Sequence, residues 1–206
     1  MARSVVCVSR SAGAGGEEVG KLVAERLGFL YVDEEVVARA AARSGIDIER
    51  VADEERRKSM FAGLLEYLAE GGGAVVLAAA PVQADGPSGE AVRAFIREAV
   101  QDFVERGRTV IVAHAASFAV GAGEETLRVL VTAPQETRAR RLAEAGGLDA
   151  EEAGRLVRRS DGDRSDYLKR FYGVPQELPT HYDLVINTDT ISFAHAADVI
   201  AKAAGA

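Results

Sequence analysis

The sequence predicts an α/β domain built on a doubly wound sheet of five parallel strands. Short, continuous apolar runs alternate along the chain with longer segments in which apolar residues recur at helical spacing. Strands that are apolar throughout are typical of parallel sheets that helices cover on both faces. A glycine-rich segment at residues 11–16 separates the first apolar run from the first helical segment, as phosphate-binding loops do in such folds.

Length and composition restrict the class of protein. With 206 residues, 48% of them hydrophobic and 28% charged, the chain is expected to form one globular domain. The net charge of −7 argues against a dedicated nucleic-acid-binding protein. No apolar run approaches a membrane span, and the N-terminus lacks a signal-peptide pattern. The single cysteine, Cys7, excludes an internal disulfide, which suits a reducing cytoplasm. From these features together we expect a cytoplasmic protein without nucleic-acid or membrane partners.

The N-terminal elements follow one another closely. Residues 5–8 predict a buried strand, and the glycine-rich loop comes next. A helix ending at Gly28 is then predicted from the one-sided spacing of its apolar residues, Val19, Leu22, Val23 and Leu27. Residues 29–32 predict a second short strand, which ends at Asp33.

The middle of the chain is mainly helical by its spacing. Helices are predicted over residues 34–43, 47–57, 60–69 and 90–105. Three glycines at 71–73 interrupt this pattern, and residues 83–89 are typical of a loop. Residues 75–78 fit a strand or the start of a buried helix, and periodicity does not distinguish the two.

The C-terminal half supplies the remaining strands of the sheet. These are predicted at residues 109–113, 127–131 and 183–187. The helices between and after them are predicted at residues 134–145, 149–159, 164–172 and 193–203. In a sheet of this kind ligands bind at the carboxyl ends of the strands.

The glycine-rich loop has the outline of a phosphate-binding loop but not its consensus. A P-loop reads G-x-x-x-x-G-K-[ST], with a lysine for the β- and γ-phosphates and a hydroxyl for magnesium. Aligned on its glycines, the chain has Arg10 at the first glycine, Gly16 at the lysine and Glu17 at the hydroxyl. The dinucleotide fingerprint G-x-G-x-x-G fits no better, because its third glycine falls on Glu18. The loop predicts either a phosphate site or a turn that lets a helix pack close to the sheet.

Polar residues that follow the strands are candidates for contacting a ligand. Asp33 and Arg39 could both face a ligand held over the sheet; alternatively, Asp33 caps the next helix and Arg39 is solvated. His114 follows the central strand at the same end of the sheet and could touch a substrate. His181 and His195 are expected at the surface or in helix caps. No spacing of histidine, cysteine and aspartate suggests a structural metal site.

A basic region stands out in the C-terminal half of this acidic chain. It comprises Arg138, Arg140, Arg141, Arg155, Arg158, Arg159, Arg164, Lys169 and Arg170. Residues 155, 158 and 159 share one helical face, and Asp161 and Asp163 follow, where they could orient guanidinium groups. Such a region could be a solvated face. It could also be a mobile lid that neutralises charge and excludes water during phosphoryl transfer.

Several segments, taken together, resemble one known family. They are Ser9-Arg10-Ser11-Ala12-Gly13-Ala14-Gly15-Gly16, Leu27-Gly28, Tyr31-Val32-Asp33, Thr132-Ala133 with Arg138-Ala139-Arg140-Arg141, Asp161-Gly162-Asp163-Arg164 with Tyr167, Phe171, Tyr172 and Gly173, and Tyr182-Asp183-Leu184-Val185-Ile186-Asn187-Thr188. These are similar to the opening loop, the corner after the first helix, the lid and the last strand of the cytidylate kinase-like family. This family is a branch of the P-loop nucleoside monophosphate kinases. The resemblance runs nearly end to end and is weakest over residues 58–90.

The resemblance accounts for the missing lysine, because family members also lack it, and Arg10 is our candidate for the replacement cation. The chain departs from the family at two places. Glu17 stands where members commonly have a basic or polar residue. Ala113-His114 stands where they commonly have Gly-Arg, whose arginine is associated with the acceptor nucleotide.

The resemblance implies a single domain of P-loop kinase type over residues 1–206, with a helical insert for the nucleoside monophosphate at about 34–106 and a helical lid at about 146–173. It implies transfer of a phosphoryl group from ATP, with Mg²⁺, to CMP or another nucleoside monophosphate. The implied phosphate-binding residues are Ser11, Ala12, Gly13, Ala14, Gly15, Gly16 and Glu17. The implied catalytic residues are Arg10, Arg158, Arg159, Arg164 and Asp161, and the acceptor-binding residues are Asp33, Arg39 and His114. No separate metal site is implied, and a homodimer stays open.

Two other functions remain open from the sequence alone. The first is a catalytically weak or inactive module of the same fold that binds nucleotides in a regulatory or scaffolding role. The second is a dinucleotide-binding protein with Asp33 on the ribose, against which the mismatch at Glu18 argues.

Overall fold

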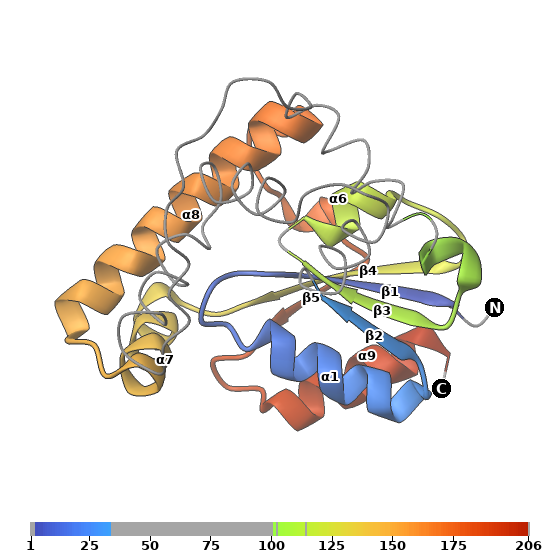
Figure 1. The fold of residues 1–206 in the computed structure, drawn as a ribbon, viewed down its shortest axis with the longest axis horizontal. Helices are drawn as coiled ribbons and strands as arrows, with labels where there is room; N and C mark the ends of the chain where they lie inside the picture. Colours follow the sequence, from blue (N-terminus) through green and yellow to red (C-terminus); the bar gives the residue numbers. More distant parts are fainter. Residues whose placement is uncertain (1–2, 34–100, 102, 114, 206) are drawn as a thin grey trace, which may run out of the picture.

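The computed structural model describes residues 3–33, 101, 103–113 and 115–205. Within these segments five strands form one parallel sheet in the order β2-β3-β1-β4-β5 (Figure 1). The strands are β1 (Val5–Arg10), β2 (Leu30–Asp33), β3 (Thr109–Val112), β4 (Thr126–Thr132) and β5 (Leu184–Asn187). The predicted five-stranded parallel sheet is therefore confirmed, and β1 lies at its centre.

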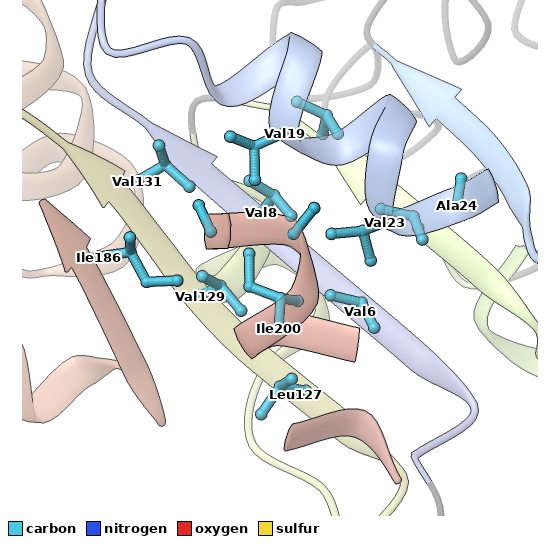
Figure 2. Close-up of a cluster of buried hydrophobic side chains, with 14 of the residues drawn as sticks. Val6, Val8, Val19, Val23, Ala24, Leu127, Val129, Val131, Ile186 and Ile200 are labelled. Carbon is cyan, nitrogen blue, oxygen red and sulfur yellow. The ribbon is translucent and has the colours of Figure 1, made fainter. Parts of the chain in front are cut away.

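Helices lie on both faces of the sheet because the central strand is apolar on both sides. Val6 and Val8 of β1 pack with α1 (Gly16–Leu27) and α9 (Phe193–Ala204) in one cluster of buried side chains, which Figure 2 shows. Val5 and Cys7, which alternate with them, pack on the opposite face with Ala116 of α6 (Ala116–Val120). The doubly wound arrangement follows from this alternation. The short helix α6 was not predicted from the sequence.

The helix ends agree well with the sequence signals. Gly28 ends α1 in the left-handed conformation, with φ of 63°, as predicted. Helix α7 (Gln135–Gly146) begins after Pro134, and α9 begins after Ser192, whose hydroxyl accepts a hydrogen bond from the amide of His195. A short 3₁₀ turn, η1 (Pro179–His181), precedes β5.

One prediction about the lid region is wrong. The helices predicted at residues 149–159 and 164–172 are a single helix of 23 residues, α8 (Ala150–Tyr172). Its buried stripe runs without a break, but two members in the middle of it, Ser160 and Arg164, are polar. Apolar spacing therefore predicts two helices with a gap between them where the structure has one. Gly162, which costs about 1 kcal/mol relative to alanine in a helix, does not interrupt it.

The helices predicted over residues 34–43, 47–57 and 60–69, the ambiguous segment 75–78 and most of the helix predicted at 90–105 lie outside the described residues. The described residues of that last helix, 101 and 103–105, are helical. None of the described helices combines the length and the apolar character that a membrane span requires.

Candidate active site

The loop between β1 and α1 lies at the carboxyl end of the central strand, where the topology places ligands. Gly13 and Gly15 both adopt left-handed backbone conformations, with φ of 76° and 78°. A Cβ atom on Gly13 would lie 2.6 Å from the main-chain oxygen of Arg138, and one on Gly15 would lie 2.2 Å from the ring of Phe193. Both positions therefore require glycine, for conformation and for space.

Some amides of this loop donate hydrogen bonds within the protein and others do not. The amide of Ser11 donates to the carbonyl of Val131 at 3.1 Å, and that of Ala14 donates to the carbonyl of Ser11 at 3.0 Å. Among the described residues, the amides of Gly13, Gly15 and Gly16 donate to no other group. They adjoin the N-terminus of α1, which carries the partial positive charge of the helix dipole. Such an arrangement can bind an anion, and phosphate above all.

Arg10 reaches the glycine loop from the end of β1. Its side chain is 7% exposed, and its Nη2 lies 2.8 Å from Oε1 of Glu17. The aliphatic part of Arg10 crosses Gly16, because a Cβ atom there would lie 2.5 Å from the Arg10 Cβ and 3.0 Å from its Cδ. The arginine stem thus fills the space into which a P-loop lysine at position 16 would extend. This close contact explains why glycine stands at position 16 when arginine stands at position 10.

Glu17 is the partner of Arg10 in the first turn of α1. Its side chain is 45% exposed, so the ion pair lies at the surface of the site rather than inside the core. A carboxylate in the first turn also interacts favourably with the positive end of the helix dipole. Any phosphate that binds the loop would meet both the cation of Arg10 and the negative charge of Glu17.

Asp33 ends β2 at the same end of the sheet. Nearby, the hydroxyl of Tyr31 is buried and has no hydrogen-bond partner among the described residues. Burial raises the pKa of Tyr31 well above its usual range, and the negative charges of Asp33 and Glu17 add to this, while Arg10 opposes it. Tyr31 was not among the predicted site residues, although it precedes Asp33 in the motif. The other acceptor candidates, Arg39 and His114, lie outside the described residues.

Arg158 and Arg159 are exposed on α8. Arg159 Nε lies 4.0 Å from Oδ2 of Asp163, one turn along the same helix. Arg155, on the same face, pairs with Glu151 at 2.6 Å. In the part of the chain that the structure describes, neither Arg158 nor Arg159 donates a hydrogen bond to the glycine loop.

Arg164 is buried, unlike its predicted companions in the lid. Its Nε donates to Oε2 of Glu177 at 2.8 Å, its Nη2 donates to the Tyr182 hydroxyl at 3.1 Å, and its Nη1 donates to the main-chain oxygen of Arg10 at 3.3 Å. Burial acts to lower the pKa of Arg164, but the hydrogen bonds and charge of Glu177 outweigh it and raise the pKa. Burial likewise acts to raise the pKa of Glu177, and Arg164 together with Tyr182 lowers it instead. Arg164 therefore links α8 to the end of β1.

Asp161 also binds an arginine, but of another helix. Its two oxygens accept hydrogen bonds from Nη1 and Nη2 of Arg138, at 2.8 and 2.7 Å. Gln135 Nε2 donates to the same carboxylate at 3.0 Å. Arg138 is buried in the first turn of α7 and also donates to the carbonyl of Ala133 at 2.9 Å. Asp161, which was predicted to orient the arginines of the lid, thus joins α8 to α7 through Arg138.

The described residues contain no group of three or more histidine, cysteine, aspartate or glutamate side chains that could hold a metal by themselves. Glu17 and Asp33 are two carboxylates at the same end of the sheet, and the charges of both act on Tyr31, whose hydroxyl has no hydrogen-bond partner in the described part of the chain. Magnesium in phosphate-transfer sites is commonly held by one or two carboxylates, several waters and the phosphates of the substrate. These residues therefore fit a magnesium ion bound together with a nucleotide, and not a metal site that is complete without one.

Comparison with known proteins points to one family. A sequence model of the cytidylate kinase-like family matches residues 5–190. The cytidylate kinase of Methanopyrus kandleri is 30% identical over 149 residues, which cover 68% of this chain and 75% of that protein.

Solved structures share the fold at low sequence identity. An uncharacterized protein from Eubacterium ventriosum superposes with a TM-score of 0.69 at 15% identity, and the match covers 98% of each chain. Shikimate kinase from Bacteroides thetaiotaomicron superposes with a TM-score of 0.53 at 13% identity over 97% of each chain. At these identities the likeness shows the fold alone, which is that of the P-loop kinases.

Proposed function

The chain belongs to the cytidylate kinase-like family, and we propose that it transfers the γ-phosphoryl group of ATP to the phosphate of a nucleoside monophosphate, CMP being the first candidate. The observation that carries the proposal is the glycine loop, whose amides at Gly13, Gly15 and Gly16 are available to an anion beside the guanidinium of Arg10. In the reaction, an oxygen of the acceptor phosphate bonds to the γ-phosphorus. The bond from that phosphorus to the β,γ-bridging oxygen breaks, and ADP leaves.

On the donor side, the segment from Ser11 to Glu17 would cradle the phosphates of ATP. Arg10 would supply the positive charge that a P-loop lysine supplies in other kinases, and its burial against Gly16 supports this role because it limits the positions the guanidinium can take. Magnesium, when bound with ATP, neutralises charge on the β- and γ-phosphates. Glu17 is the residue we assign to it.

On the acceptor side we assign Asp33, Arg39 and His114, of which Asp33 is supported by its place at the carboxyl end of β2. The lid would contribute Arg158 and Arg159, whose exposed cations could reach a migrating phosphoryl group when the lid closes.

Arg164 and Asp161 form ion pairs with Glu177 and Arg138 respectively, so we expect their effect on catalysis to depend on those ion pairs. An enzyme of this class would act on free nucleotides in the cytoplasm. Whether it forms a homodimer is tested by light scattering on the purified chain.

The decisive experiment measures turnover and binding on the same preparation. A coupled assay follows ADP formation with ATP, Mg²⁺ and each of CMP, dCMP, UMP, AMP and GMP, while calorimetry measures ATP binding. Turnover with at least one acceptor above the rate of ATP hydrolysis supports the proposal. Binding of ATP without turnover on any acceptor would favour the inactive nucleotide-binding module instead. Absence of ATP binding at millimolar concentration would reject both.

A further inference from the structure

Three side chains from distant segments hold the back of the glycine loop by its carbonyl groups. Arg138 Nη1 donates to the oxygen of Ala12 at 3.3 Å, and Arg141 Nη1 approaches the oxygen of Gly13 at 3.5 Å. The hydroxyl of Thr188 donates to the oxygen of Ala14 at 2.8 Å. Three successive carbonyls of the loop therefore accept hydrogen bonds from side chains of α7 and of the segment after β5.

The direction of a carbonyl decides the direction of the next amide. The peptide unit is planar and trans, so its C=O and N–H groups point in opposite directions. A hydrogen bond to the oxygen of Ala14 therefore turns the amide of Gly15 to the other side of the loop. A bond to the oxygen of Ala12 does the same for the amide of Gly13. These are two of the amides that are available to an anion.

Thr188 is the most tightly placed of the three. It follows β5 and is 1% exposed, and its amide donates to the carbonyl of Thr132 at 2.8 Å. Its hydroxyl accepts from Arg141 Nη1 at 3.0 Å while it donates to Ala14, and Arg141 Nη2 donates to its carbonyl at 2.7 Å. The guanidinium of Arg141 lies 5.0 Å from the ring centroid of Phe193, the ring that packs against Gly15. The hydroxyl is one link of a continuous contact between α7, the end of β5 and the loop.

We propose that Thr188 is a positioning residue, whose hydroxyl holds the Ala14 carbonyl so that the Gly15 amide faces the donor phosphates. Arg138 does the same for Gly13 through the carbonyl of Ala12. The ligand of the oriented amides is a polyphosphate chain, and in this respect the inference rests on the proposed function. Thr188 itself does not touch the ligand.

Substitution of Thr188 tests this directly, with inorganic tripolyphosphate as the probe. We expect Thr188→Val, which keeps the shape and removes the hydroxyl, to weaken tripolyphosphate binding about tenfold or more, as when groups that orient ligating residues are removed. Thr188→Ser, which restores the hydroxyl, should recover most of the affinity. With active enzyme, Thr188→Val should raise the KM for ATP and leave the KM for the acceptor close to its original value.

The chain contains a matched control in Thr109. This residue is also 1% exposed, and its hydroxyl donates to the carbonyl of Gly107 at 2.9 Å, but it lies at the amino end of β3, at the opposite end of the sheet. Thr109→Val should lower stability in urea as Thr188→Val does, and leave tripolyphosphate affinity unchanged. Equal affinity losses in the two variants, or none in folded Thr188→Val, would overturn the positioning role.

A second variant keeps the inference testable if Thr188→Val does not fold. Arg138→Lys retains a cation beside Asp161 but lacks the planar fork that reaches both Asp161 and the Ala12 carbonyl. It should also weaken tripolyphosphate binding, and wild-type affinity in this variant would then overturn the inference. Wild-type protein that binds no tripolyphosphate would contradict the proposed function itself. Binding by the wild type with unchanged affinity in the variants contradicts the positioning role alone.

Discussion

The side chain of Arg10 fills the space that any side chain at position 16 would need: a Cβ atom on Gly16, at the start of α1, would lie 2.5 Å from the Cβ of Arg10. A side chain at position 16, such as the lysine of a P-loop, is therefore incompatible with the present position of Arg10. On the proposed function, arginine at position 10 takes the place of that lysine. The absence of the lysine from the motif follows from packing.

This relationship makes a prediction for restoring the lysine. Gly16→Lys alone should destabilise the protein by about 1–3 kcal/mol, the usual cost of overpacking. The double change Arg10→Gly with Gly16→Lys should be more stable than the sum of the two single changes allows, because glycine removes the Cβ of residue 10, which would lie 2.5 Å from a Cβ at position 16, together with the rest of the side chain. Urea unfolding of the four proteins measures this coupling. Strictly additive effects would show that the two side chains do not compete.

Glu17 presents a second test, since two effects oppose each other there. Removing its charge loses roughly 0.3–1 kcal/mol of favourable interaction with the helix dipole. A phosphate at about 5 Å would be repelled by about 3 kcal/mol per unit charge at an effective dielectric of about 20, although Arg10 screens part of this. We expect Glu17→Ser to tighten tripolyphosphate binding in calorimetry and to lower thermal stability slightly.

The same variant tests the magnesium role that we propose for Glu17. Weaker binding of magnesium-ATP in Glu17→Ser, with metal-free tripolyphosphate binding unchanged or stronger, would identify the carboxylate as a magnesium ligand. Glu17→Gln, which keeps the size of the side chain, separates loss of charge from loss of volume.

The exposed lid arginines should act on turnover more than on binding. Charge on the migrating phosphoryl group develops during transfer, so cations that meet it stabilise the transition state more than the bound substrate. Alanine at Arg158 or Arg159 should lower kcat by about 10²-fold with a smaller change in ATP affinity. Arg155→Ala is the control, because Arg155 shares the face but is held by Glu151 at 2.6 Å, whereas Arg159 lies 4.0 Å from Asp163. Equal losses of affinity and turnover would indicate a binding patch only.

The Arg164–Glu177 pair predicts a dependence of stability on pH. Because the pKa of Glu177 is lowered in the folded protein, its contribution is present above the ordinary carboxyl pKa and is lost as the pH falls through the folded value. Glu177→Gln should cost about 3 kcal/mol near pH 7, since it leaves the buried Arg164 without that carboxylate charge. The difference from wild type should shrink below about pH 4.

Urea unfolding between pH 7 and 3 measures this difference. The same measurement on Asp183→Asn serves for comparison. The pKa of Asp183 is also lowered, chiefly by its hydrogen bonds with Arg128, but this residue lies at the amino end of β5, away from the glycine loop. A difference between wild type and Glu177→Gln that stays constant over this pH range would contradict the assignment to Glu177.

The strands, most of the described helices and the place of the glycine loop could be predicted from the sequence. These are local properties: an apolar run at 5–8, one-sided spacing in α1 and a glycine at position 28 each act within a few residues of the chain. The failure at α8 has the same origin. Its buried stripe includes Ser160 and Arg164, and apolar spacing does not reveal that a polar residue is buried.

The tertiary structure alone decided the strand order and the pairs that shape the site. Thr188 and Ala14 are 174 positions apart, and Arg164 reaches the carbonyl of Arg10 across 154 positions. No spacing rule connects such residues, because their separation along the chain is set by the elements between them. Arg10 and Gly16 are only six positions apart, yet their close contact also depends on the path of the loop between β1 and α1. Which side chain orients an amide or fills a space depends on where the packed elements bring it.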